Sequence, residues 1–385
     1  MTNFATPDVV SLFFQSARRA VGVALLTMLA AGAAFAQPIA KPATPAAAVP
    51  LSLRLEGTLT LRSPASAWGD LALDEPARKL FLARRAAGVS VYNIDTLKPL
   101  GEIPDTRGAL AIALAPGIGG PVGRGFSANG DMGEKSLTVF DLGTYRTVAK
   151  VSLDFSPAAI SYDTGSQHLA VMSDANGATP TIFVIDALKL DVVKKIELST
   201  APGGMAADGR GRLFVTLPAK DSIAVYNLLG GELLGTWAVA PCKQPGVSAF
   251  DRQSFRLITM CRGTPGFAVA IDVLTGKVAA SARIGNQAGQ IAVDPRAGLL
   301  YFASGKDANL TVMQARGADR YEALEQVSTR PLAENIAVDS RTGRVFLVAG
   351  DFVRTVPIQS DLPVTTRIVA NSYTILVYRR MPIEP

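Results

Sequence analysis

Two fifteen-residue stretches near the carboxyl end decide the fold: IAVDPRAGLLYFASG at residues 291–305 and IAVDSRTGRVFLVAG at residues 336–350. Each has a short apolar run ending in Asp, a turn that contains Gly, and a second apolar run. The Asp side chain can accept hydrogen bonds from backbone groups of the turn, and Gly provides the positive φ that such a hairpin needs. Each stretch therefore predicts an antiparallel pair of strands.

The same pattern recurs seven times along the chain, at spacings of 41 to 48 residues. The first apolar run of the seven copies ends at Asp74, Ala115, Asp163, Asp208, Asp251, Asp294 and Asp339. About twenty residues on, each copy carries a third strand such as VSVYN, LTVFD or IFVID, and a fourth follows in most copies. Four short antiparallel strands in every 40 to 50 residues are typical of a propeller blade, whereas a two-sheet sandwich would not keep this period.

The seventh copy has no fourth strand before the chain stops at Pro385, while residues 51–61 (LSLRLEGTLTL) form a strand pattern that no copy uses. That strand can complete the seventh blade and leave no open sheet edge. We therefore predict an all-β fold, a seven-bladed β-propeller over residues 51–385. In this fold the N-terminal strand closes the ring by completing the last blade.

Several segments resemble the secreted YVTN-type β-propeller repeat family. These are VAIDVLTGKV at residues 269–278, IAVDSRTGRV at residues 336–345, and GRGFSAN at residues 123–129 followed by LTVFDL. The last pair is similar to the second blade of an uncharacterised exported subgroup. The literal tetrapeptide YVTN is absent. The resemblance covers essentially all of residues 51–385 and implies a propeller and export, but it implies no common reaction.

The amino terminus predicts export. Arg18 and Arg19 precede an apolar run at residues 20–35, and Ala34-Phe35-Ala36 before Gln37 has the small-x-small pattern of a cleavage site. The run is shorter than the roughly 20 apolar residues that span a bilayer. We expect a signal peptide at residues 1–36, a Pro/Ala-rich tether at residues 37–50 and a periplasmic or secreted protein without a membrane span. Retention of the signal as an anchor is the alternative.

Composition excludes several functions. The 48% hydrophobic content is that of a folded protein, and the net charge of +6 comes without a run of Lys or Arg, so nucleic acid is not an expected partner. A single His and two Cys speak against conventional zinc sites and covalent haem. His168 lies in a turn far from any nucleophile motif, and we expect it to be an exposed turn residue.

The two cysteines predict a disulfide. Cys242 precedes the first strand of the fifth copy and Cys261 ends its second strand, and these two positions lie on the same face of a blade. Export would place them in an oxidising compartment. The alternative is two independent buried thiols.

Loops that lead into the first strand of each blade should surround the mouth of the central channel. Asp70, Glu334 and Asn335 are the candidates there for a calcium or zinc site, in which case the ion would be the one cofactor. The alternatives are ion pairs of these acids with neighbouring arginines, or a face for an anionic ligand. The residues proposed for that ligand face are Arg62, Arg107, Lys243, Gln287 and Arg330.

These observations favour a non-enzymatic exported binding or scaffold module over an enzyme, with no catalytic residues assigned. The expected partner is a protein, peptide, glycan or other anionic ligand on the loop face, and the expected state is a monomer. A long insertion in the seventh copy, residues 351–372, could cover the channel or contact a partner. The alternative function is a metal-dependent, lactonase-like hydrolase that uses the central channel.

Overall fold

The computed structural model describes residues 51–61, 67–174, 179–317, 319–355 and 365–382, all within the compact unit Val49–Pro385. The predicted signal peptide and tether lie outside these residues. The described chain is built of strands, with one 3-10 turn, η1 (Pro218–Lys220). It contains no helix of the length and apolar character that crossing a membrane requires.

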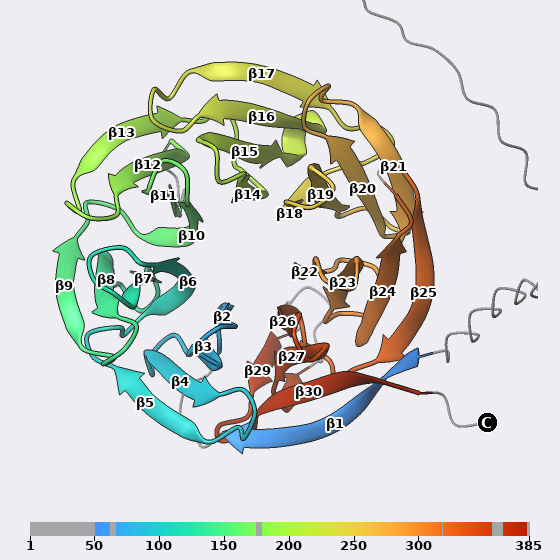
Figure 1. Cartoon of the computed structure of the whole chain (residues 1–385), viewed down its shortest axis with the longest axis horizontal. Helices are drawn as coiled ribbons and strands as arrows, with labels where there is room; N and C mark the ends of the chain where they lie inside the picture. The colour runs from blue at the N-terminus through green and yellow to red at the C-terminus, as the bar shows by residue number, and fades with distance from the viewer. Residues whose placement is uncertain (1–50, 62–66, 175–178, 318, 356–364, 383–385) are drawn as a thin grey trace, which may run out of the picture. The chain divides into compact units, whose positions relative to one another are not determined.

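Seven sheets of four antiparallel strands follow one another around a ring (Figure 1). From the innermost strand outward, blades one to three consist of β2 (Leu71–Asp74), β3 (Lys79–Ala83), β4 (Val89–Asn93), β5 (Pro99–Ile103); β6 (Ala109–Pro116), β7 (Gly123–Asn129), β8 (Ser136–Asp141), β9 (Thr147–Ser152); and β10 (Pro157–Asp163), β11 (His168–Ser173), β12 (Thr181–Asp186), β13 (Val192–Glu197). Blades four to six consist of β14 (Gly204–Ala207), β15 (Arg212–Leu217), β16 (Ser222–Asn227), β17 (Leu233–Ala238); β18 (Pro245–Asp251), β19 (Arg256–Cys261), β20 (Phe267–Asp272), β21 (Val278–Arg283); and β22 (Gln290–Asp294), β23 (Leu299–Ser304), β24 (Asn309–Ala315), β25 (Tyr321–Ser328). The chain is therefore a seven-bladed β-propeller, as its repeat predicts.

Blade seven joins the two ends of the propeller. Its sheet order is β26 (Asn335–Asp339), β27 (Arg344–Ala349), β30 (Tyr373–Pro382) and β1 (Leu51–Leu61), with β1 antiparallel to β30. Two contacts also tie β1 to blade six: the Ser52 hydroxyl and the Leu53 amide donate to the Glu325 carboxylate at 3.0 and 2.9 Å. The first strand of the propeller thus lies beside its last one.

The core lies in the seams between blades. The third strand of a blade is covered on both faces by its neighbours, so β8 is buried along almost its whole length, whereas the outer strand β9 alternates between half-buried and exposed residues. In the seam between blades one and two, the rings of Phe81 and Phe140 are both fully buried, with centroids 5.7 Å apart. Each blade therefore contributes both of its faces to the core.

Where the first strand of a blade ends in Asp, the Asp has the predicted role; blade two has Ala115 at this position. The Asp294 carboxylate accepts hydrogen bonds from the amides of Arg296 and Ala297 at 3.0 and 3.1 Å. Asp163 accepts from the Ser166 amide at 2.8 Å and also from Gly211 of the next blade at 3.2 Å. These buried carboxylates replace water as the partner of turn amides, and this explains why the repeat contains Asp at this position.

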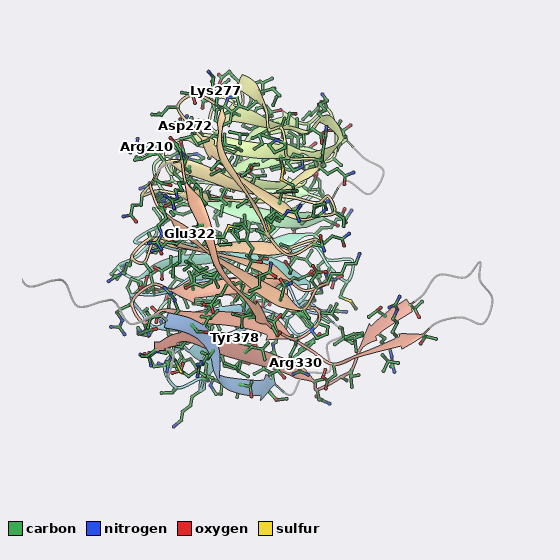
Figure 2. The ribbon with its side chains drawn as sticks, turned by 90° about the vertical axis from the view of Figure 1, so that its right-hand side faces the viewer. Arg210, Asp272, Lys277, Glu322, Arg330 and Tyr378 are labelled. Carbon is green, nitrogen blue, oxygen red and sulfur yellow. A yellow bond between two sulfur atoms is a disulfide. The ribbon has the colours of Figure 1, made fainter. Side chains whose placement is uncertain are left out.

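The insertion in blade seven forms a separate hairpin of β28 (Phe352–Thr355) and β29 (Thr365–Ile368). Figure 2 shows this hairpin projecting from the ring on the side where Arg330 lies. In Figure 1, β29 lies over the seventh sheet and not over the centre of the ring. The described strands of the insertion therefore stand beside the channel and do not cover it.

Candidate functional site

Neighbouring blades approach each other closely where the loops lead into the innermost strands. A Cβ on Gly69 would lie 2.1 Å from the Leu110 carbonyl oxygen of blade two, and a Cβ on Gly289 would lie 2.5 Å from the Cβ of Glu334 in blade seven. Glycine is required at both positions because any side chain would collide with the next blade. These approaches draw the loops together around the channel mouth.

A pocket of about 380 Å³ opens at this mouth across blades five, six and seven. We call it the mouth pocket and define it by the residues that line it from three blades: Gln244, Val247, Met260, Arg262, Gln287 and Glu334. Its volume lies within the range of small-molecule sites, and its wall combines apolar with polar side chains, as such sites do.

A disulfide holds one wall of the mouth pocket. Cys242 and Cys261 are bonded, with their Cα atoms 5.3 Å apart, and both residues are buried. The predicted bridge is therefore confirmed. Gln244 follows one cysteine by two residues and Arg262 follows the other directly, and the Arg262 amide donates to the Gln244 carbonyl at 3.1 Å. The bridge thus positions two of the polar residues that line the pocket.

The polar side chains of the pocket keep free bonding capacity. The Arg262 guanidinium donates to the Gly203 carbonyl at 3.4 Å and has no carboxylate within ion-pair distance among the described residues. The Glu334 carboxylate has neither a cation nor a hydrogen-bond donor in the same part of the chain. It is exposed on one side, and partial desolvation by the walls raises the pKa of its carboxyl. Gln287 accepts one hydrogen bond from Lys306 at 3.0 Å and keeps its amide donors.

The acidic residues proposed for a metal site have different surroundings. Asp70 accepts a hydrogen bond of 2.5 Å from the Gln290 amide nitrogen, and Gln290 in turn accepts one of 3.0 Å from the Ile336 amide. Among the described residues, no hydrogen bond or ion pair joins Asp70 to Glu334 or Asn335. No group of three or more His, Cys, Asp or Glu side chains is placed to hold a metal in the described chain. The calcium or zinc site therefore stays a prediction.

Gln290 is the residue here that the sequence did not single out. Its one side chain links blade six, to which it belongs, with Asp70 of blade one and Ile336 of blade seven. A polar side chain at the first position of an innermost strand is only a weak sequence signal for a contact between blades. The contact joins residues 220 positions apart, and only the curvature of the closed ring brings them together.

Asp70 gives a prediction about stability. Burial raises the pKa of this carboxyl from 3.8 to about 6, partly offset by the hydrogen bond from Gln290. Between these two pKa values the folded chain holds a proton that the unfolded chain has lost. Ionisation of Asp70 therefore lowers the free energy of unfolding as the pH rises from 3.8 to about 6. Asp70→Asn, which can still accept from Gln290, should therefore raise the free energy of unfolding at pH 8 by about 1–3 kcal/mol.

Urea unfolding of the wild type and Asp70→Asn at pH 8 and at pH 4 checks this prediction. The two stabilities should converge at pH 4, where Asp70 is protonated in the folded protein. A gain of the same size at both pH values, or a loss at pH 8, would show that ionisation of Asp70 carries no such cost.

The proposed cationic face is largely neutralised. Lys243 pairs with Asp221 at 2.7 Å, and Arg330 pairs with Asp351 at the base of the hairpin, not with Glu334. Arg107 is exposed, and Arg62 lies outside the described residues. The described part of this face is therefore less suited to a polyanion than its composition suggests.

His168 was predicted to be an exposed turn residue, and this prediction was wrong. It begins β11 and is partly buried, because the register of the hairpin places it opposite Asp186, with a nitrogen–oxygen distance of 4.0 Å. Its Nδ1 lies 2.5 Å from the Ser166 carbonyl oxygen. The first contact pairs β11 with β12, and the second stays within the turn between β10 and β11.

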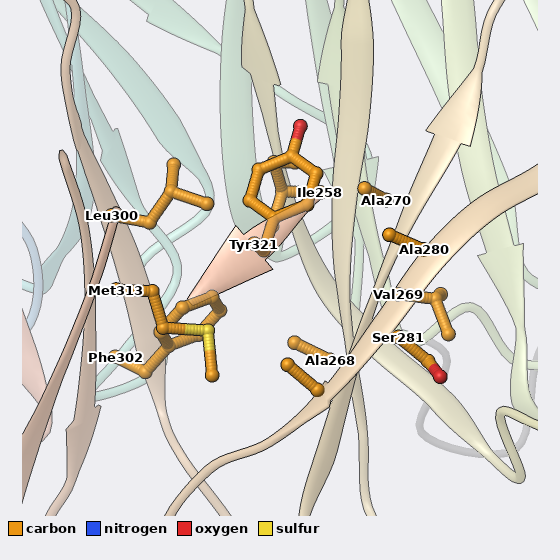
Figure 3. A pocket seen from close by; sticks show the side chains of 11 residues that line it. Ile258, Ala268, Val269, Ala270, Ala280, Ser281, Leu300, Phe302, Met313 and Tyr321 are labelled. Atoms are coloured by element: carbon orange, nitrogen blue, oxygen red, sulfur yellow. The ribbon is translucent and has the colours of Figure 1, made fainter. Parts of the chain in front are cut away.

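A second cavity lies between blades five and six (Figure 3). It exists because blade five has alanines such as Ala268 and Ala280 where larger side chains would fill the seam against Phe302 and Met313. Its volume of about 10 Å³ leaves room for one water at most. This cavity is a packing defect and not a ligand site.

Solved structures of other proteins share the propeller fold with this chain. No family model and no curated protein matches the chain. Solved structures do match. RRP9 WD40 repeats have 13% identity and a TM-score of 0.66 over 86% of this chain and all of that one. A chain of the mitotic checkpoint complex has 13% identity and a TM-score of 0.62, covering 92% of this chain and 99% of that one. A chain of Kuenenia stuttgartiensis hydrazine synthase has 14% identity and a TM-score of 0.60, covering 75% and 94%.

Proposed function

We propose that this chain is an exported, non-enzymatic binding module that recognises a polar ligand, such as part of a peptide or glycan, through the mouth pocket. The observation that carries the proposal is the pocket itself. It has about 380 Å³ of space on the loop face and is lined by Arg262 and Glu334, which have no charged partner among the described residues. Both side chains are exposed, so a ligand that enters the pocket can reach a cation on one wall and a carboxylate on the other.

Export is supported by two independent features. The amino-terminal residues 1–36 have the pattern of a signal peptide. The Cys242–Cys261 bridge is stable in an oxidising compartment and uncommon in the cytosol. A periplasmic or secreted location accounts for both.

A metal-dependent, lactonase-like hydrolase remains the second candidate, with Asp70, Glu334 and Asn335 as ligands of calcium or zinc. It has less support, because Asp70 is engaged by Gln290 and no hydrogen bond joins Asp70 to either of the other two side chains among the described residues. The fold does not choose between the two classes. One structural neighbour is part of hydrazine synthase and another is part of the mitotic checkpoint complex.

Thermal unfolding of the purified chain with three ligand pools tests the proposal. The pools are mixed short peptides, mixed oligosaccharides and small polycarboxylates. We expect one pool to raise the melting temperature, with a stabilisation of about 2.7 kcal/mol at a hundred times its dissociation constant. Arg262→Gln should remove the effect, while Arg146→Gln, an exposed arginine on the opposite face of blade two, should preserve it.

Two results would contradict the binding module. One is the absence of a shift with every pool, and the other is a shift that Arg262→Gln leaves unchanged. Hydrolysis of a lactone panel that needs added calcium or zinc and disappears in Asp70→Ala would favour the hydrolase instead.

A further inference from the structure

The mouth pocket contains one cationic and one anionic side chain, and they stand on different blades. Arg262 directly follows β19 in blade five, and Glu334 directly precedes β26 in blade seven, with blade six between them. They do not form an ion pair, although opposite charges in one pocket attract each other. A ligand that satisfies both must itself carry two opposite charges.

These two side chains lie against different glycines. The Arg262 side chain runs along Gly246, where an added Cβ would lie 3.1 Å from its Nε, and reaches the Gly203 carbonyl. The base of Glu334 lies against Gly289 and Gly305, where added Cβ atoms would be 2.5 and 3.1 Å from the Glu334 Cβ. These contacts place the Arg262 side chain along blade five and the base of Glu334 against blade six.

The rest of the pocket suits a peptide unit. Gln244 and Gln287 provide amide groups that both donate and accept hydrogen bonds, as a peptide bond requires of its partner. Val247 and Met260 add an apolar surface that can adapt to small side chains. The two charges stand on the walls of blades five and seven, so a ligand that reaches both spans the pocket.

We infer that the mouth pocket binds a short peptide with both termini free, its carboxylate on Arg262 and its ammonium group on Glu334. This inference rests on the proposed function and specifies the ligand of the same pocket. Desolvation by the walls raises the pKa of the Glu334 carboxyl, and an ammonium group beside it would oppose this shift and stabilise the carboxylate.

Calorimetric titration with four forms of one peptide tests the inference. The probes are trialanine, N-acetyl-trialanine, trialanine amide and the doubly blocked peptide, with alanine and dialanine as shorter controls. Blocking either terminus should weaken binding about 10- to 100-fold, the effect of losing one charge-assisted hydrogen bond. In Arg262→Gln the free and amidated peptides should bind equally. In Glu334→Gln the free and acetylated peptides should bind equally.

Matched substitutions outside the pocket should leave the ratios of binding between the free and the blocked peptides unchanged. Arg146→Gln removes a cation from blade two, and Glu197→Gln removes a carboxylate from the outer strand β13. Equal binding of all four forms, or no binding of trialanine at millimolar concentration, would overturn the inference. If a different ligand pool still stabilises the chain in an Arg262-dependent way, the proposed function survives. If none does, both fail.

Discussion

Leu53→Ala should lower the free energy of unfolding by about 2–5 kcal/mol, whereas Leu55→Ala, two residues along the same strand, should change it by less than about 0.5 kcal/mol. Leu53 is 2% exposed and belongs to the core cluster between blades six and seven, with Tyr301 and Leu347. Leu55 is 51% exposed. The difference reflects the cavity that truncation of a buried side chain leaves behind.

Chemical denaturation of the wild type, Leu53→Ala and Leu55→Ala measures the difference in stability between them. The same experiment tests how the ring closes. Because β1 is the outer strand of the last blade, loss of the Leu53 contacts weakens the seam where the two ends of the propeller meet. Equal effects at both positions would mean that β1 does not occupy this seam in solution. A larger effect at Leu55 would indicate that the strand is shifted by two residues, which keeps its faces and moves Leu55 into the buried position of Leu53.

The repeat period made the architecture predictable. Six of the seven blades use an Asp to cap the first hairpin, and every blade has apolar residues in its second and third strands. These needs are local, so they appear in the sequence of the individual copies. The disulfide was predictable for a related reason. Cys242 and Cys261 flank two consecutive strands of one blade, and the topology of a blade alone brings such positions together.

Contacts between blades were not predictable in the same way. Gln290 meets Asp70 across the mouth, and Arg330 turns to Asp351 in the inserted hairpin and not to Glu334. Both outcomes depend on the tilt of the blades and on the path of individual loops, which the repeat does not encode. The mouth pocket was predictable in part. Gln287 and Glu334 were identified as residues of the channel mouth, but their sharing of one pocket with Arg262 required the structure.

Replacing both cysteines, Cys242→Ser with Cys261→Ser, should lower the free energy of unfolding by about 3 kcal/mol. The bridge closes a loop with a sequence separation of 19 residues, and a cross-link over a loop of this length removes that much entropy from the unfolded chain in the chain-entropy model. Both cysteines are buried, so two hydroxyls also enter an apolar cluster that includes Val269 and Ile271. The loss should therefore be at least as large as the entropic contribution.

Comparison with the reduced wild-type protein separates the two causes. Denaturant unfolding of the wild type with and without a reducing agent measures the bridge alone, and the double variant adds the cost of the hydroxyls. Loosening of the loop should also weaken any ligand bound by the mouth pocket, because Gln244 and Arg262 lie within two residues of the bridge. Mass spectrometry under non-reducing conditions that finds two free thiols would contradict the bridge. A stability unchanged by reduction would show that the remaining contacts of blade five hold this wall without it.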